Sequence, residues 1–493
     1  MILRCIGHTF RYEMENVCRI FYPYDRMTEE DDGSGREVNT IVEEIPGGAR
    51  LTVRIRLEDR PMQELHSEVS AAEPDFRDRC ELGLAVLLYE YFTKACDFTP
   101  KWGILTGVRP IKLMRRLMAE MGEEGARTYF RDKLLVSPSK IDLSVATAHA
   151  EQAIVDKSRP DSFSLYVSVP FCPTRCSYCS FVSQSIQKAA KLLPEYVDRL
   201  CDELVATGRL AKELGLRLET VYYGGGTPTT FSAPQLARVI KTIEGAFDLS
   251  HVREYTVEAG RPDTITREKL EALRDGGVTR ISINPQTMND AVLERIGRRH
   301  SAAQTVEAFE LARRVGMNNI NMDTIAGLPG DTVDSFRRTM EILTGLDPES
   351  ITVHTLAIKH AAYLNHEKGL SLAKEAAAVD EMVNFSQAHL TQAGHRPYYL
   401  YRQSKMLGNL ENVGWAKPGY ECLYNVYIME ETHTILACGA GATTKLRNPY
   451  TDQIERIFNY KFPYEYNSRF GEMLDRKEKV RAFYASAFHK QHN

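Results

Sequence analysis

Three closely spaced cysteines are the residues with the clearest chemical potential. Cys172, Cys176 and Cys179 form the pattern C-x3-C-x2-C, whereas the other seven of the ten cysteines are scattered. So few cysteines in 493 residues exclude a disulfide scaffold, and three crowded thiols then indicate a metal centre in a reducing compartment. A [4Fe–4S] cluster with three cysteine ligands keeps one iron open to a substrate or cofactor, and we favour this interpretation. A zinc site with a distant fourth ligand is the alternative.

The cysteines directly follow a predicted strand that begins a series of alternating strands and helices. Strands are predicted at 164–169, 219–223, 253–258, 278–283, 318–325 and 351–357, and helices at 192–214, 232–247, 266–274, 290–315 and 332–344. This alternation is typical of parallel βα units, and six units are fewer than the eight of a complete barrel. The pattern therefore predicts an α/β fold, either a partial (β/α)6 barrel or a doubly wound sheet. In both, ligands bind at the carboxyl ends of the strands.

The ends of the chain differ from this middle part. We predict an N-terminal α+β accessory domain at 1–158, a (β/α)6 core at 159–358 and a mixed α/β extension at 359–493. Short strands are expected before residue 57, helices at 74–96, 110–121, 139–157 and 372–393, and further strands at 424–429 and 434–436. With 43% hydrophobic residues and a net charge of −4, the composition is that of a soluble globular protein. We expect a cytoplasmic protein without a membrane span or a nucleic-acid partner.

Polar and small residues follow several of the later strands. Residues 224–226 are three consecutive glycines after the second strand, and glycine lets the backbone approach a ligand closely, although a plain tight turn is the commoner interpretation. Glu258 closes the third strand, and Asp323 lies near the end of the fifth. A carboxylate at either place suits ribose hydroxyls, and a solvated strand end is the alternative.

Basic residues near the strand ends are weaker candidates. Arg298 or Arg299 has the chemistry to clamp a carboxylate, with a solvated basic helix end as the alternative. His354, Lys359 and His360 follow the sixth strand. They are candidates for facing a tetrapyrrole carboxylate or an intermediate, but a solvated rim is the more common role of such residues.

The cysteine pattern after the first strand, with Tyr178 before the last cysteine, resembles the radical S-adenosylmethionine (SAM) superfamily. The resemblance implies that the open iron is chelated by the amino and carboxylate groups of SAM. It also implies that an electron from the reduced cluster cleaves SAM to methionine and a 5′-deoxyadenosyl radical, which abstracts hydrogen from the substrate.

Three motifs narrow the resemblance: Leu-Tyr-Val-x-x-Pro-Phe-Cys at 165–172, Gly-Gly-Gly-Thr-Pro-Thr at 224–229 and Asp-x-Ile-x-Gly-Leu-Pro-Gly at 323–330. Over residues 165–444 the chain resembles the oxygen-independent coproporphyrinogen III oxidases, particularly the HemZ type with its long amino-terminal extension. By this resemblance the cluster ligands are Cys172, Cys176 and Cys179, and the SAM contacts are Tyr166, Tyr178, Gly225, Gly226, Thr227, Glu258, Gln286, Arg298, Asp323, Ala357 and Thr443.

The implied activity is oxidative decarboxylation of coproporphyrinogen III to protoporphyrinogen IX, an oxidoreductase step in haem biosynthesis. It requires a tetrapyrrole substrate, an electron donor for the cluster and an electron acceptor that the sequence does not name. The family's oxidases read C-x3-C-x2-C-x-C, whereas Phe181 occupies the last position here, as in the haem-chaperone relatives. The His-Asn-x-x-Tyr-Trp motif of those chaperones has no counterpart in residues 421–427. A haem chaperone-like protein and a radical SAM enzyme for another tetrapyrrole therefore stay open.

Overall fold

The computed structural model describes residues 1–23, 25–30, 33–58, 60–181, 183–357, 372–403 and 406–489. Residue contacts divide the chain into two compact units. The first contains Met1–Val145, Ala357–Asp380 and Tyr401–Glu411, and the second contains Ala146–Leu356, Glu381–Leu400 and Asn412–Asn493. The predicted division into the consecutive domains 1–158, 159–358 and 359–493 stays a prediction.

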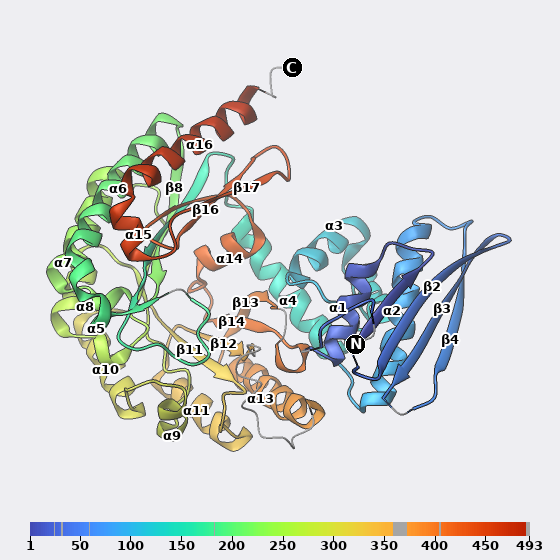
Figure 1. Cartoon of the computed structure of the whole chain (residues 1–493). Coiled ribbons are helices and arrows are strands. Elements are labelled where there is room, and N and C mark those ends of the chain that lie inside the picture. The colour runs from blue at the N-terminus through green and yellow to red at the C-terminus, as the bar shows by residue number, and fades with distance from the viewer. Residues whose placement is uncertain are drawn as a thin grey trace. The chain divides into compact units, whose positions relative to one another are not determined.

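The first unit contains a four-stranded sheet in the order β1-β2-β3-β4, in which β1 is parallel to β2 and the other pairs are antiparallel. Its helix α2 contacts both α1 and the strands β3 and β4 (Figure 1). The elements are β1 (Ile2–Ile6), α1 (Arg11–Phe21), β2 (Arg36–Ile45), β3 (Gly48–Leu57), β4 (Gln63–Ser70), α2 (Phe76–Cys96) and α3 (Pro110–Thr128), and α4 (Pro138–Val155) begins in this unit.

The prediction of strands alone before residue 57 is wrong at α1. Met14, Val17, Cys18 and Phe21 recur at helical spacing and are all buried, so this segment gains more from one apolar helix face than from the alternating pattern of a strand. The helices predicted at 74–96, 110–121 and 139–157 are confirmed by α2, α3 and α4.

In the first unit, Glu411 forms a fully buried ion pair with Lys140. Its Oε1 lies 2.6 Å from Nζ of Lys140, and both side chains are 0% exposed. Its Oε2 accepts a hydrogen bond of 2.7 Å from the indole Nε1 of Trp102. Because residues 102 and 140 lie in the segment Met1–Val145 and residue 411 ends Tyr401–Glu411, these two contacts connect two separate segments of the unit.

The second unit is built on an eleven-stranded sheet in the order β13-β14-β12-β11-β10-β9-β8-β5-β15-β16-β17. Six strands run parallel in unbroken chain order: β5 (Ser162–Val169), β8 (Arg217–Gly225), β9 (Glu254–Glu258), β10 (Arg280–Ser282), β11 (Ile320–Ala326) and β12 (Ser350–Thr355). The predicted α/β fold is confirmed. The unbroken order matches a partial (β/α)6 arrangement and not a doubly wound sheet, whose strand order reverses at a switch point.

The helices between these strands lie together along one side of the sheet (Figure 1). They are α6 (Leu193–Glu213), α7 (Ala233–Ala246), α8 (Arg267–Asp275), α9 (Asp290–Arg295), α10 (Ala302–Val315) and α11 (Val333–Leu346). Residues close in the sequence determine where two of these helices begin. Capping boxes form at the N-termini of α7 and α10, from Ser232 with Gln235 and from Ser301 with Gln304. The side chains at the carboxyl ends of the six strands therefore gather at one edge of the sheet.

Of the remaining elements, β13 and β14 extend the sheet beyond β12, β15 to β17 extend it beyond β5, and β6 pairs with β7 in a separate two-stranded sheet. These elements are β6 (Phe171–Cys172), β7 (Gln184–Ser185), α5 (Ile186–Ala189), α13 (Leu372–Gln392), β13 (Arg396–Tyr401), β14 (Asn412–Ala416), α14 (Leu423–Glu430), β15 (Thr434–Cys438), β16 (Thr443–Arg447), β17 (Ile454–Phe458), α15 (Pro463–Ser468) and α16 (Phe470–His489). Strand β15 adds in parallel beside β5. Among the described residues, no helix is long and apolar enough to cross a membrane.

The strand predicted at 424–429 is wrong, because this segment is helix α14. Glu254 of the distant strand β9 accepts hydrogen bonds at Oε2 from the backbone N–H of Leu423, 2.8 Å, and at Oε1 from that of Tyr424, 3.3 Å. A carboxylate at a helix N-terminus satisfies orphan N–H groups and complements the helix dipole. This tertiary contact overrides the β propensity of the aromatic and β-branched residues in the segment.

Candidate functional site

The three cysteines lie in a loop at the carboxyl end of β5. The two-residue strand β6 ends at Cys172 and pairs in parallel with β7, and the backbone N–H of Gln184 donates to the carbonyl of Pro170 over 2.8 Å. These contacts join the two ends of the loop that contains the cysteines. The three thiols are half-buried and form no disulfide. The described residues contain no group of three or more His, Cys, Asp or Glu side chains placed to hold a metal ion.

The three-glycine segment is bonded directly to the start of this loop. The backbone N–H of Gly226 donates to the carbonyl of Val169 over 2.6 Å, and that of Thr227 donates to the carbonyl of Phe171 over 2.7 Å. A Cβ at Gly226 would lie 2.5 Å from the carbonyl oxygen of Phe171, so only glycine allows this approach. The Thr227 hydroxyl also donates to Sγ of Cys172 at 3.5 Å. The segment is therefore more than a plain turn, because it positions the first cysteine.

Glu258 lies beside a stack of three tyrosines. Tyr166 of β5 and Tyr222 of β8 are stacked with ring centroids 6.2 Å apart, and Tyr424 of α14 stacks on Tyr222 at 4.4 Å. The Tyr222 hydroxyl donates to Oε1 of Glu258 over 2.6 Å. Burial raises the pKa of Glu258 to about 7 even though the Tyr222 hydrogen bond lowers it, and the nearby charge of Asp323 raises it further. Glu258 thus has a carboxyl group that changes its charge near neutral pH.

Asp323 has the opposite electrostatic environment. Burial raises its pKa, but the bonds and charge of His354 outweigh this, so the pKa lies below the ordinary 3.8. Nε2 of His354 is 3.8 Å from Oδ2 of Asp323, and Nδ2 of Asn321 donates to Oδ1 over 2.7 Å. Asp323 is therefore an anion with two oriented partners. It lies two residues after Asn321, the residue of β11 that the strand register aligns with Glu258 through Ser282 of β10.

Gln286 adopts an unusual backbone conformation after β10. Its φ is +71°, in the left-handed region that favours glycine, and it is held there by three bonds. Its N–H donates to the carbonyl of Asp323, and its own carbonyl accepts from the N–H of Ile325 and the hydroxyl of Thr324. Its side-chain Oε1 is buried and has no hydrogen-bond partner among the described residues. A strained, buried amide with an unsatisfied oxygen is suited to a ligand.

Arg298 is buried and faces the cysteine loop, whereas Arg299 is exposed. Its Nε donates to the hydroxyl of Tyr178 over 3.2 Å, and Nη1 donates to the carbonyl of Asn284. The structure therefore joins two of the predicted SAM contacts, Arg298 and Tyr178, by a hydrogen bond.

Ala357 and Thr443 are the remaining predicted contacts. Ala357 forms an isolated bridge with Met406 and belongs to the first unit. Thr443 is the first residue of β16, where it pairs with Phe458. The turn before it contacts the site more directly, because the carbonyl of Ala440 accepts a 2.8 Å hydrogen bond from the hydroxyl of Ser168 at the end of β5. Lys359 and His360 lie outside the described residues.

Sequence reasoning missed several residues of the site. Tyr222 had a usable signal, because it occupies the second predicted strand two residues before the glycine segment and so shares a face with it. Arg261 likewise lies in the loop that follows β9, which ends at Glu258. Tyr424 had none, since its segment was predicted as a strand.

The residues present fit a [4Fe–4S] cluster and SAM. Three thiols outside any disulfide supply the donor chemistry of a cluster with one open iron. Glycines that allow close backbone approach, the anion of Asp323 and the unsatisfied Oε1 of Gln286 gather at the same edge of the sheet. Of the predicted SAM contacts, Tyr166 and Asp323 lie within β5 and β11, Gly225 and Glu258 end β8 and β9, and the loops contain Tyr178, Gly226, Thr227, Gln286 and Arg298.

Comparisons with known proteins agree with this chemistry. Residues 166–343 match the family model of the radical SAM superfamily. The chain is 42% identical over 385 residues to the oxygen-independent coproporphyrinogen-III oxidase-like protein HemZ of Bacillus subtilis, covering 77% of each chain. It is 32% identical over 310 residues to the heme chaperone HemW of the same organism, covering 61% of this chain and 77% of that protein. The solved coproporphyrinogen III oxidase HemN of Escherichia coli matches with a TM-score of 0.51 and 23% identity, over 66% of this chain and 73% of that one.

Proposed function

This chain belongs to the HemZ-type family of radical SAM proteins, and we propose that it catalyses the oxygen-independent decarboxylation of coproporphyrinogen III to protoporphyrinogen IX. Its cofactors are a [4Fe–4S] cluster and SAM, as in the superfamily. The observation that carries the proposal is the cysteine loop at the carboxyl edge of a six-strand parallel sheet whose other strand ends carry polar ligand groups. The HemZ relative, 42% identical, supports a tetrapyrrole substrate.

The proposed reaction converts two propionate side chains to vinyl groups. For each propionate, a hydrogen atom leaves the β-carbon, the carboxylate departs as carbon dioxide and one further electron passes to an acceptor. The bound cofactors supply the organic radical that takes the hydrogen atom. We expect a one-electron acceptor from outside the chain, an electron donor for the cluster and a reducing, cytoplasmic setting.

Residues of this chain bind and orient the reactants. Cys172, Cys176 and Cys179 would hold the cluster, and the glycine segment keeps Cys172 in place. The anion of Asp323 is suited to accept hydrogen bonds from ribose hydroxyls, and Gln286 offers a free acceptor in Oε1. The Arg298 guanidinium is suited to a carboxylate.

The test is anaerobic reconstitution of the full chain with iron and sulfide, followed by product analysis. Coproporphyrinogen III and haem are supplied in parallel with SAM and a reductant. We expect 5′-deoxyadenosine and protoporphyrinogen IX from the first substrate. SAM cleavage without decarboxylation would refute the substrate, and a colourless, zinc-loaded protein would refute the radical SAM chemistry.

A matched pair of cysteine variants connects the activity to the proposed ligands. Cys176→Ala removes a proposed ligand, whereas Cys201→Ala removes a buried thiol inside α6. We expect the first variant to lose the brown colour and all turnover, and the second to keep both. Equal iron content in the two variants would contradict the ligand assignment.

The second candidate function is haem binding and delivery. The similarity to the heme chaperone HemW and the phenylalanine at position 181 support it, and the Phe181 side chain is 61% exposed. Stoichiometric haem uptake and transfer without turnover in the parallel assay would favour this candidate over the decarboxylase. A turnover product from haem would instead indicate a radical SAM enzyme for another tetrapyrrole.

A further inference from the structure

The cysteine loop is also bonded to the turn that follows α9, in addition to the bond between Tyr178 and Arg298. Besides the glycine segment, the backbone N–H of Ser177 donates to the carbonyl of Ile296 over 3.1 Å. The hydroxyl of Thr174, midway between the first two cysteines, donates to the carbonyl of Gly297 over 3.0 Å. Both contacts are made to the turn that follows α9. Because Thr174 lies between the first two cysteines, any further contact that orients its side chain also affects the spacing of these cysteines.

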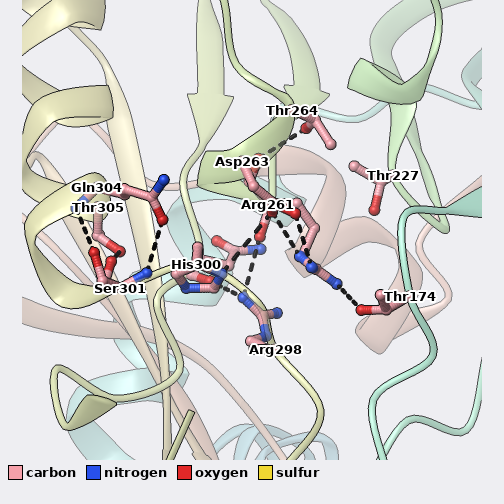
Figure 2. A network of polar contacts seen from close by, with 12 residues as sticks. Thr174, Thr227, Arg261, Asp263, Thr264, Arg298, His300, Ser301, Gln304 and Thr305 are labelled. Carbon is pink, nitrogen blue, oxygen red and sulfur yellow. Dashed lines mark hydrogen bonds and ion pairs between the residues drawn. The ribbon is translucent and has the colours of Figure 1, made fainter. Parts of the chain in front are cut away.

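Arg261 provides that second contact. It lies in the loop after β9 and is only 3% exposed. Its Nη1 donates to the hydroxyl oxygen of Thr174 over 3.0 Å (Figure 2). The Thr174 hydroxyl thus accepts from one loop and donates to another, so its rotamer is fixed from both sides. One hydroxyl joins the loops that follow β5, β9 and α9.

Asp263 fixes the guanidinium itself. Its two carboxylate oxygens accept from Nε and Nη2 of Arg261, each at 3.0 Å, in the planar bidentate geometry that only arginine offers (Figure 2). The neighbouring His300 does not compete as a cation. Burial and the charges of Arg298 and Arg261 lower its pKa to about 4, so it is neutral at neutral pH. Arg261 therefore points its remaining Nη1 at Thr174.

We propose that Arg261 is a positioning residue that holds the Cys172–Cys176 segment in the geometry required for the cluster, acting through Thr174. The proposal rests on the cofactor assignment and is independent of the substrate. The bidentate pair with Asp263 aims the guanidinium, and the guanidinium then fixes a side chain two residues from each of two proposed ligands. Without this contact, the three cysteines are still present, but the distance between Cys172 and Cys176 is less restricted.

The test measures how firmly the full, reconstituted chain retains its iron. Arg261→Gln removes the fork and the charge, Arg261→Lys keeps the charge alone, and Thr174→Val removes the hydroxyl at constant shape. Arg267→Gln is the control, because Arg267 is an exposed arginine on α8 that forms an ion pair along its own helix with Glu271. Iron release to bathophenanthroline disulfonate, the EPR spectrum of the reduced cluster with and without SAM, and the thermal unfolding midpoint are recorded for each variant.

We expect Arg261→Gln and Thr174→Val to release iron about tenfold faster than the wild type, with an altered EPR line shape. In Thr174→Val, which leaves the Arg261–Asp263 pair intact, the unfolding midpoint should be unchanged. The double variant should be no faster than Thr174→Val, because removal of the hydroxyl already abolishes the contact with Arg261 together with the bond to Gly297. Arg261→Lys should recover part of the retention, and Arg267→Gln all of it. Iron release from Arg261→Gln and Thr174→Val at the control rate would overturn the proposal, as would additive effects in the double variant. A lack of decarboxylation alone would refute only the proposed function, since no readout here uses the substrate.

Discussion

The carboxyl group of Glu258 should titrate near neutral pH, and the hydrogen bond from Tyr222 should help to set its pKa. The Tyr222 hydroxyl donates to Oε1 at 2.6 Å and stabilises the ionised form, while burial opposes it and raises the pKa from the ordinary 4.5 to about 7. A hydrogen bond to a charged group contributes about 1.5–3 kcal/mol. Since 1.36 kcal/mol corresponds to one pKa unit, Tyr222→Phe should raise the pKa of Glu258 from about 7 to roughly 8–9.

The assay is a pH titration of the protonated carboxyl stretch by infrared difference spectroscopy, with Glu258→Gln identifying the band. Tyr223→Phe is the matched control, because Tyr223 is the next residue of the same strand and its buried hydroxyl has no hydrogen-bond partner among the described residues. We expect the midpoint to rise in Tyr222→Phe and to stay near 7 in Tyr223→Phe. A midpoint that stays or falls in Tyr222→Phe would refute the reasoning.

The same group makes stability depend on pH. Because the folded pKa lies above the unfolded value, the unfolded chain releases the proton first as the pH rises. The contribution of Glu258 to stability is therefore present below about pH 4.5 and is lost as the pH rises through about 7. Glu258→Gln should abolish this loss, so the variant should gain stability relative to the wild type between these pH values, by up to about 3 kcal/mol.

Two further predictions concern the buried ion pair and the glycine segment. Glu411→Ala leaves the ammonium of Lys140 buried without its carboxylate, and should lower the free energy of unfolding by about 3–5 kcal/mol in denaturant titrations. A loss below 1 kcal/mol, as for an exposed pair, would contradict this. Gly226→Ala places a Cβ 2.5 Å from the Phe171 carbonyl and should reduce the iron bound after reconstitution, whereas Gly245→Ala, which meets nothing within 4 Å, should not. Equal iron in both glycine variants would argue against the close approach.

Features that depend on neighbouring residues could be predicted from the sequence. The six parallel strands and their helices were predictable because apolar runs and caps such as Ser232 with Gln235 act within a few residues. The cysteine loop was predictable for the same reason, since three cysteines lie within eight residues. In each case the determining contacts are local in the chain.

Features determined by distant residues could not be predicted. Helix α14 depends on Glu254, which lies 169 residues before Leu423 in the chain. The contact of Arg261 with Thr174 spans 87 residues, and nothing near Thr174 signals it. The charge state of Glu258 depends in the same way on Tyr222, 36 residues away on the neighbouring strand. Spacing within one segment carries no information about these pairs.

Gln286 illustrates why structure adds functional information at such positions. A left-handed φ at a non-glycine residue costs on the order of 1–3 kcal/mol, and a buried acceptor without a partner adds a further cost. A sequence selected for stability alone would place glycine there, which relieves the strain and removes the unsatisfied oxygen. The three bonds that hold the Gln286 backbone keep its amide at the carboxyl edge of the sheet in spite of both costs. Gln286 follows β10, the neighbour of the strand that carries Asp323, and its N–H is bonded to the Asp323 carbonyl. A ligand that satisfies Oε1 when it binds is the best explanation for a glutamine at this position.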